Sequence, residues 1–220
     1  MALRLINALS SPYGRKVAIA LKEKGICFTQ TFDVPWSEAT CVSQFSPLEQ
    51  LPILILDDGA AVYDSSFILD WLEVRFPSPP LISSNREQAL DTRFLKLLGE
   101  RVMEAIHAIV FEFQRAEPSQ PFIDRQSRKV RRGLAEIEAT IERRKPQDGI
   151  EIDIGDIAVG SMLLLVPFLI ENGFVPDLEV LRWRDRHAGL TAFADRLAAR
   201  PSFRETTPML MDVDLKSVMA

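Results

Sequence analysis

The spacing of hydrophobic positions changes near residue 77 of the chain. Before that point short apolar runs alternate with helical segments, and after it apolar residues recur almost everywhere at intervals of three and four. Short apolar runs are typical of buried strands, and the longer interval is typical of amphipathic helices. The pattern therefore predicts an α/β domain at residues 1–77, a proline-containing linker at 78–85 and an all-helical domain at 86–220.

The first part is predicted to fold in the order β-α-β-α-β-β-α. The first four elements are expected to form a parallel βαβ unit with a right-handed crossover. The turn sequence Asp57-Asp58-Gly59 is expected to join the last two strands as a hairpin. On the first helix, Arg15 and Lys16 are expected to point outward. The expected strands lie at residues 3–6, 28–34, 51–56 and 60–62, and the expected helices follow Ser11, Ser37 and Asp64.

The second part is predicted to contain helices at 86–115, 124–144 and 153–170, with one or two more within 179–200. The longest nearly apolar run, residues 157–170, has 14 residues and contains Pro167. Because a bilayer span needs about 20 residues, this run is interpreted as a buried core helix and no membrane association is predicted. His187 lies in a charged stretch and is expected at the surface.

Composition narrows the classes of function. The chain has 47% apolar and 26% charged residues, which is typical of a soluble globular protein. Its net charge of −5 gives no basic footprint, so neither nucleic acid nor an acidic membrane surface is expected as a partner. Two cysteines and two widely separated histidines predict neither a disulfide scaffold nor a metal site. The first residues do not have the character of a signal peptide, so a cytoplasmic protein is expected.

The stretch Ser11-Pro12-Tyr13-Gly14 lies between the first expected strand and the first expected helix. Thiol–disulfide proteins place Cys-Pro-Tyr-Cys at this point, where the helix N-terminus stabilises a thiolate. Serine and glycine replace both cysteines here, which argues against dithiol exchange but leaves a hydroxyl able to donate to another molecule's thiolate. Taken alone, the motif is explained more simply by a serine that caps a helix.

Two further motifs have both a structural and a functional interpretation. A cis bond before Pro52 would turn the backbone of Leu51 outward to pair with an extended peptide, whereas a trans proline at a strand start is the simpler explanation. Asp64-Ser65-Ser66 is an N-cap signal before an apolar helix. The free N–H groups and hydroxyl at such a helix start also form a carboxylate site, and Asp64 suits an ammonium group beside it.

Together the three motifs supply a partner for a thiolate, a clamp for peptide backbone and a site for an amino-acid head group. Glutathione, a γ-glutamyl tripeptide thiol, has all three requirements. Over nearly its whole length the chain resembles the soluble glutathione S-transferases, and in particular bacterial-like members of the serine type. That resemblance implies a thioredoxin-like N-terminal domain followed by an all-helical C-terminal domain.

Four stretches carry the resemblance. Residues 10–25 are similar to the first loop and helix of the serine-type classes, and residues 46–54 resemble the family pattern Asn-Pro-x-Gly-Lys-Val-Pro-x-Leu. Residues 64–68 resemble Glu/Asp-Ser-x-x-Ile. Residues 153–158 resemble the Ser/Thr-x-x-Asp-Ile-Ala capping box, in which Asp153 would cap the helix and Asp156 would reach back to it.

The resemblance implies a role for each matching residue. Ser11, with Ser10 as the alternative, would donate a hydrogen bond to the glutathione sulfur and favour the thiolate. Leu51, before a cis Pro52, would pair with the cysteinyl backbone. The remaining positions implied are Asp64 and Ser65 for the γ-glutamyl end, Gln50 near the glycyl carboxylate, and Met103, Glu104, His107 and Phe111 for a second-substrate pocket. A homodimer is implied, and no metal is required.

Three positions depart from the family pattern. Glu49 replaces glycine and brings a negative charge near a dianionic tripeptide, Gln50 replaces a lysine, and Ser46 replaces asparagine. The favoured function is transfer of glutathione to a small, often apolar electrophile. Alternatives are a glutathione-dependent isomerase, dehalogenase or peroxidase at the same site, or a non-catalytic binding or regulatory protein with this fold.

Overall fold

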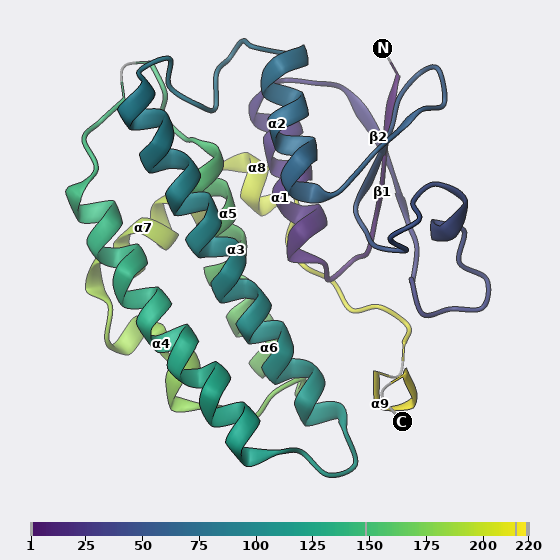
Figure 1. Cartoon of the computed structure of the whole chain (residues 1–220), viewed down its shortest axis with the longest axis vertical. Coiled ribbons are helices and arrows are strands. Elements are labelled where there is room, and N and C mark those ends of the chain that lie inside the picture. Colours follow the sequence, from purple (N-terminus) through teal and green to yellow (C-terminus); the bar gives the residue numbers. More distant parts are fainter. Residues whose placement is uncertain (1, 148, 214, 219–220) are drawn as a thin grey trace. The chain divides into compact units, whose positions relative to one another are not determined.

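The computed structural model describes residues 2–147, 149–213 and 215–218 (Figure 1). The chain divides into two compact units. The first unit comprises the chain up to Ile82 together with Pro201–Val213, and the second comprises Ser83–Arg200 with the end of the chain. The segment Pro201–Val213 therefore joins the unit built by the start of the chain, although the sequence pattern placed it with the helices.

The first unit is built on one four-stranded sheet with the order β2-β1-β3-β4. β1 (Leu3–Asn7) pairs in parallel with β2 (Phe28–Phe32) and antiparallel with β3 (Ile53–Ile55), which in turn pairs antiparallel with β4 (Ala61–Val62). The connection from β1 to β2 runs through α1 (Pro12–Glu23). This is the predicted βαβ unit followed by a hairpin, so the thioredoxin-like fold class is confirmed.

The two faces of this sheet are covered by different elements. α1 and α2 (Ser65–Arg75) pack against each other (Figure 1). Ile6, Ile53 and Ile55 form a buried cluster with Val42, which belongs to the short 3-10 helix η1 (Val42–Gln44). Because side chains alternate along a strand, the fully buried Leu5 and Leu54, which are register partners, point to the opposite face.

The prediction of a helix after Ser37 is wrong in length. Only the short 3-10 helix η1 forms there. The reason lies in local hydrogen bonds. The Ser37 hydroxyl accepts from the Ala39 N–H at 3.2 Å, and the Thr40 hydroxyl accepts from the Val42 N–H at 3.3 Å. Such side-chain contacts with nearby backbone compete with helix formation, so residues 37–41 stay in turns.

Arg15 and Lys16 are buried, which contradicts the expectation that they point outward. α8 (Pro201–Arg204) packs on α1, and Arg15 Nη2 donates to the Phe203 carbonyl at 3.2 Å. Burial lowers the pKa of Arg15 to about 10. This contact joins residues 188 positions apart, so no local pattern in the sequence could have indicated it.

The second unit is helical throughout its long elements. α3 (Arg86–Gln114) packs against both α4 (Gln120–Arg143) and α5 (Ile154–Leu163). Further elements of this unit are α6 (Val166–Glu171), η2 (Glu179–Leu181), η3 (Trp183–Asp185), α7 (Ala188–Ala198) and α9 (Leu215–Val218).

The apolar stretch Ile154–Glu171 meets the length and hydropathy of a membrane span, and it is the one such stretch among the described residues. It consists of α5 and α6 with a turn between them, and 67% of it is buried inside the protein. A mostly buried apolar helix is what the core of a globular unit requires, and the predicted position of these residues in the core is observed.

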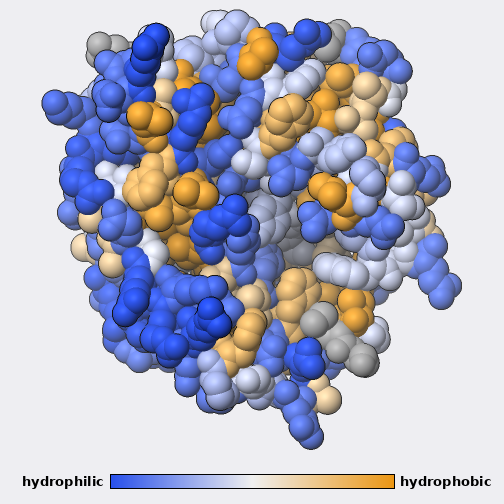
Figure 2. Space-filling model, in the orientation of Figure 1, coloured by the Kyte–Doolittle hydropathy of each residue, from blue (hydrophilic) through white to orange (hydrophobic). Residues whose placement is uncertain are grey.

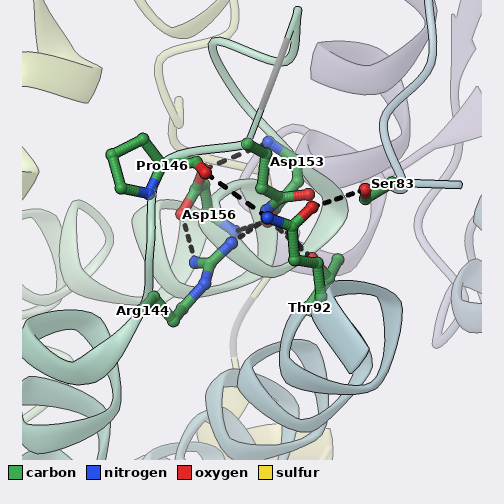
Figure 3. Close-up of polar contacts among 8 residues, drawn as sticks. Ser83, Thr92, Arg144, Pro146, Asp153 and Asp156 are labelled. Carbon is green, nitrogen blue, oxygen red and sulfur yellow. Dashed lines mark hydrogen bonds and ion pairs between the residues drawn. The ribbon is translucent and has the colours of Figure 1, made fainter. Parts of the chain in front are cut away.

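Polar side chains that hydrogen-bond to one another surround the start of α5 (Figure 3). Asp153 accepts from the Asp156 N–H at 2.9 Å, and Asp156 accepts from the Asp153 N–H at 3.1 Å, which completes the predicted capping box. Thr92 Oγ1 and Gln147 Nε2 also donate to Asp153, at 2.8 and 2.6 Å, and Arg144 forms ion pairs with both aspartates. Asp153 is fully buried, and its carboxylate is satisfied from four directions.

Candidate functional site

The three sequence motifs meet at one end of the sheet. Ile6 near the end of β1 is the register partner of Ile53 at the start of β3, and Val62 at the end of β4 is the partner of Leu54. Because β3 is antiparallel to both neighbours, the segments that follow β1 and β4 and the segment that precedes β3 lie at the same edge. These segments carry Ser10 and Ser11, Asp64 and Ser65, and Gln50, Leu51 and Pro52, respectively.

Ser11 is the N-cap residue of α1 and is half-buried. Its hydroxyl oxygen accepts from the Gly14 N–H at 3.2 Å, so the hydroxyl proton is left to donate elsewhere. The first turn of α1 contains no acidic residue, and the helix N-terminus favours a negative charge at this point. Ser10, the alternative candidate, is half-buried in the turn before it.

Gly14 lies directly against the side chain of Asn7. A Cβ atom at Gly14 would lie 1.5 Å from Asn7 Oδ1. Asn7 is buried at the end of β1, and its Oδ1 accepts from the Ala8 N–H at 2.8 Å. The absence of a side chain at position 14 therefore allows α1 to approach the end of β1. Sequence analysis did not single out Asn7, although a polar residue ending a buried apolar strand was the available signal.

The peptide bond between Leu51 and Pro52 is cis. Within the described part of the chain, the backbone N–H and C=O of Leu51 take part in no hydrogen bond. The Leu51 side chain packs on the cluster of Ile6, Val42, Ile53 and Ile55. The residue is thus held by its side chain, and its backbone polar groups are left for a partner.

A turn before Leu51 contains two of the residues that depart from the family pattern. The Ser46 carbonyl accepts from the Glu49 N–H at 3.1 Å, and the Ser46 hydroxyl accepts from the Leu48 N–H at 3.2 Å. Serine therefore makes the side-chain turn contact that asparagine makes in such turns. Glu49 has a φ of 50°, a left-handed conformation that glycine adopts without steric cost.

Asp64 and Ser65 form the start of α2. Asp64 Oδ1 accepts from the N–H groups of Ser66 and Phe67, at 3.0 and 3.2 Å. Asp64 itself is exposed, and Ser65 is only 5% exposed. Within the described residues, neither the hydroxyl nor the N–H of Ser65 takes part in a hydrogen bond. This helix start is therefore capped by Asp64 but keeps unpaired donors.

The residues predicted for a second-substrate pocket follow α3 in the other unit. His107 and Phe111 stack, with ring centroids 6.3 Å apart and an interplanar angle of 29°. Burial lowers the pKa of His107 to about 4, against a smaller opposing effect of its hydrogen bond with the Met103 backbone. Met103 is buried, whereas Glu104 is exposed and pairs with Arg101 at 2.7 Å. His107 is therefore neutral at physiological pH, which suits packing rather than proton transfer.

Among the described residues, no three histidine, cysteine, aspartate or glutamate side chains are grouped in a way that could hold a metal ion. Cys27 and Cys41 are both free and exposed. The segments that meet at the end of the sheet themselves offer hydroxyl, carboxylate and backbone groups.

Comparison with known proteins identifies the family. The model of the glutathione S-transferase N-terminal domain matches residues 10–75. A glutathione S-transferase from Methylobacterium radiotolerans, in complex with glutathione sulfonate, is 39% identical, with a TM-score of 0.84 over 97% of this chain and 98% of that one. A second, from Methylobacillus flagellatus with glutathione bound, is 30% identical, with a TM-score of 0.83 over 94% of this chain and 100% of that one.

A curated relative is similar over the same length. The uncharacterized GST-like protein YibF of Escherichia coli is 27% identical over 209 residues, which span 94% of this chain and 98% of YibF. The chain therefore belongs to the glutathione S-transferase family, as its sequence motifs indicated.

Proposed function

We propose that the protein is a cytoplasmic glutathione transferase that conjugates the thiolate of glutathione to a small, often apolar electrophile. The observation that carries the proposal is the convergence of three segments with unpaired polar groups at one end of the sheet. Two relatives that match nearly the whole of this chain have glutathione or its sulfonate bound in their structures, which supports the same ligand here.

The site suits each part of the tripeptide. Asp64 Oδ2 accepts no hydrogen bond from the described residues and is available to the γ-glutamyl ammonium group, while the Ser65 N–H and hydroxyl face the γ-glutamyl carboxylate. The backbone of Leu51 pairs with the cysteinyl residue as an added strand. Gln50 is exposed beside it and donates its amide to the glycyl carboxylate.

Ser11 is proposed to act on the thiol. Its hydroxyl, oriented by the Gly14 N–H, donates to the sulfur, and the N-terminus of α1 adds a favourable field. Both effects stabilise the thiolate and lower the thiol pKa. The thiol proton passes to solvent. The sulfur electron pair then forms a carbon–sulfur bond with the electrophile, which releases a leaving group or takes up a proton after addition.

The α3 residues are proposed to contact the electrophile. The stacked, neutral His107 and Phe111 give an apolar surface, with Met103 behind it and the charged Glu104 at its margin. Replacing His107 with alanine is therefore expected to raise the KM for an apolar electrophile several-fold while the Kd for glutathione stays unchanged.

We propose that the protein forms a homodimer. Leu90, Phe94 and Leu97 recur at helical spacing on α3 and are 60%, 44% and 43% exposed. Figure 2 shows apolar side chains among hydrophilic ones on the visible face over α3. Sedimentation equilibrium is expected to find a dimer for the wild type and for Phe122→Glu, a matched exposed position on α4, and a monomer for Phe94→Glu.

Calorimetric titration with glutathione tests the central proposal. The wild type is expected to bind at micromolar to millimolar concentrations, and Ser65→Ala is expected to bind about tenfold more weakly because a hydrogen bond to a charged group is lost. Ser11→Ala is expected to keep its affinity but to raise the pKa of the bound thiol, followed by thiolate absorbance. Ser10→Ala is the matched control; a raised pKa in that variant instead would make Ser10 the donor.

A non-catalytic role is the alternative outcome. Glu49 and Gln50 leave the glycyl end without a cation, which favours weak binding. No heat and no thermal shift with about ten millimolar glutathione, a concentration above the expected range of Kd, would refute the transferase proposal and leave a binding or regulatory protein. An isomerase, dehalogenase or peroxidase would instead bind glutathione normally and be distinguished by its product, which is a rearranged substrate, a released halide or a reduced peroxide, respectively.

A further inference from the structure

The segment that follows α8 returns to the loop that carries Ser10 and Ser11. The Met209 N–H donates to the Leu9 carbonyl at 3.1 Å. Leu9 directly precedes the two serines, and the bond joins residues from opposite ends of the chain. Both residues belong to the first unit.

The chain around α8, which precedes Met209, is held against α1 by several contacts. α8 is fixed along α1 by Arg15, which donates to the Phe203 carbonyl, by a hydrogen bond between Ser202 and Glu23, and by an ion pair between Lys22 and Glu205 at 2.6 Å. The contacts span α1 from its first turns to its last residue. The direction in which the chain leaves α8 is therefore set by α1 itself.

The residues after α8 continue that fixed path. The hydroxyls of Thr206 and Thr207 donate to the carbonyls of Ser202 and Arg204, at 2.7 and 2.9 Å, and satisfy the end of α8. Pro208 is buried, whereas Met209 and Leu210 are 59% and 57% exposed. The contact of Met209 with the loop is thus made by its backbone and does not depend on burying its side chain.

The loop has few other restraints. The Ser11 N–H donates to the Ala8 carbonyl at 3.0 Å, and the Ser11 hydroxyl accepts from the Gly14 N–H. Both of these bonds are internal to the loop and the first turn of α1. The bond from Met209 is the one that reaches Leu9 from a distant part of the described chain.

We propose that Met209 is a positioning residue of the site: its backbone N–H holds the Leu9 carbonyl and thereby fixes the direction of the Ser11 hydroxyl toward the glutathione sulfur. The inference rests on the proposed function, because it concerns how well the serine stabilises a bound thiolate. It assigns a role to the C-terminal segment, far in sequence from every motif that points to glutathione.

Two substitutions in the full chain separate the backbone of Met209 from its side chain. Met209→Pro removes the N–H donor, and Met209→Ala keeps the donor but removes most of the side chain. The pKa of the bound thiol is expected to rise by about half a unit in Met209→Pro, a roughly threefold loss of thiolate at a given pH, and to stay unchanged in Met209→Ala. The Kd for glutathione is expected to stay within about twofold of the wild type in both, because the γ-glutamyl and cysteinyl contacts are untouched.

Amide hydrogen exchange provides readouts that do not depend on conjugation. The Ser11 amide is expected to exchange faster in Met209→Pro than in Met209→Ala, with the Ile19 amide in α1 unchanged. In the wild type, saturation with glutathione is expected to slow exchange of the Met209 amide by about twofold, the largest change in Kd expected for the proline variant, and to leave that of Leu210 unchanged, because coupling between two sites is reciprocal. This last measurement needs no substitution and decides the question even where the proline variant misfolds.

Equal behaviour of the two variants in thiol pKa and in Ser11 exchange would overturn the proposal, as would a Met209 amide that is indifferent to glutathione. Failure of the wild type to bind glutathione would refute the proposed function alone. The exchange of Ser11 in the two variants would then still show whether the segment holds the loop.

Discussion

Among the described residues, two helices begin with an aspartate cap, and they differ in what surrounds the cap. At the start of α5, Asp153 is buried and receives hydrogen bonds from Asp156, Thr92, Gln147 and Arg144. At the start of α2, Asp64 is exposed and accepts from two backbone N–H groups, while the donors of Ser65 remain unpaired. The same cap therefore closes one helix end as part of the core and leaves the other open for a ligand.

The two caps are alike, and the two helix starts differ in whether residues from other segments donate to the capping aspartate. Arg144 and Gln147 come from the end of α4 and the loop after it, and Thr92 comes from α3. No distant side chain of the described residues donates to Asp64. A helix N-terminus can bind a ligand where no other segment of the protein supplies acceptors to its free N–H groups, since an unpaired donor favours an incoming anion.

The largest effect is expected from removing the closed cap. Asp153→Ala leaves Arg144, Thr92 and Gln147 without their acceptor in the interior, so the free energy of unfolding should fall by about 3–5 kcal/mol. Asp64→Ala, the same change at the open helix start, should cost only about 1 kcal/mol. Urea unfolding followed by circular dichroism measures both. Equal losses would show that the two caps do not differ as described, and Thr92→Val, which removes a single donor, provides a milder variant.

The second prediction concerns the charge of the open cap. Asp64→Asn keeps a good cap, so stability should change by less than about 0.5 kcal/mol. It removes the partner of the γ-glutamyl ammonium group, so the Kd for glutathione should rise about tenfold. Calorimetry measures the affinity. Asp58→Asn, which removes a charge from the hairpin turn of the same unit, serves as the control and should bind glutathione as the wild type does.

The third prediction concerns the start of α7, where a carboxylate from another helix accepts hydrogen bonds and where a change of pH can test the contact. Glu138 on α4 accepts from the Gly189 N–H at 2.9 Å and pairs with His187 Nδ1 at 2.5 Å. His187 was expected at the surface, but its side chain is partly buried and pairs with Glu138 of α4. Although desolvation opposes the shift, the hydrogen bond and charge of His187 and the backbone donors together lower the pKa of Glu138 below its ordinary 4.5.

Because the folded-state pKa of this acid is depressed, its contribution to stability is present above pH 4.5 and disappears as pH falls through the lowered value. Glu138→Gln should therefore be about 1 kcal/mol less stable near neutrality, and the gap to the wild type should close in acid. Unfolding curves at several pH values measure this. Glu142→Gln, at an exposed position of the same helix, should follow the wild type throughout; a gap that persists in acid would contradict the assignment.

The smallest effect is expected beside the open helix end, at Glu49. Its left-handed φ of 50° costs a residue with a Cβ about 1 kcal/mol, which glycine does not incur. Glu49→Gly should therefore be up to about 1 kcal/mol more stable than Glu49→Ala. Both variants remove the same charge, so they should bind glutathione equally, and slightly more tightly than the wild type. Thermal unfolding separates them, and identical stabilities would show that the backbone is not strained there.

How much of this was predictable from sequence differs between regions. The capping box at Asp153 and the cap at Asp64 were both predicted, because capping is a local interaction between residues two or three positions apart. The succession of strands along the chain in the first unit was also predicted, because short apolar runs and turn residues are local signals too. The roles of Ser11, Leu51 and Ser65 in binding stay predictions.

Contacts between segments that are distant in the chain were not predicted from the sequence. The burial of Arg15 depends on α8, and the contact of Leu9 depends on Met209, about two hundred positions away. Arg144 and Gln147 around Asp153 were not anticipated either, although the cap itself was. Apolar residues at a spacing of two, or of three and four, indicate which face of a strand or helix is apolar. They do not indicate which remote segment covers that face.

The close packing of Gly14 on Asn7 has a consequence for how such a protein changes over time. A chain of this fold with cysteine at positions 11 and 14 carries out dithiol exchange, and in this protein two substitutions would restore both sulfurs. The second of them requires the Asn7 side chain to move, because a Cβ at position 14 would lie 1.5 Å from the Asn7 Oδ1 atom that accepts from the Ala8 N–H. A cysteine at position 14 is therefore expected to cost the hydrogen bond between Asn7 and Ala8 unless position 7 changes as well. The asparagine at the end of the first strand thus makes a dithiol at this point costly to introduce, for natural selection and for a designer alike.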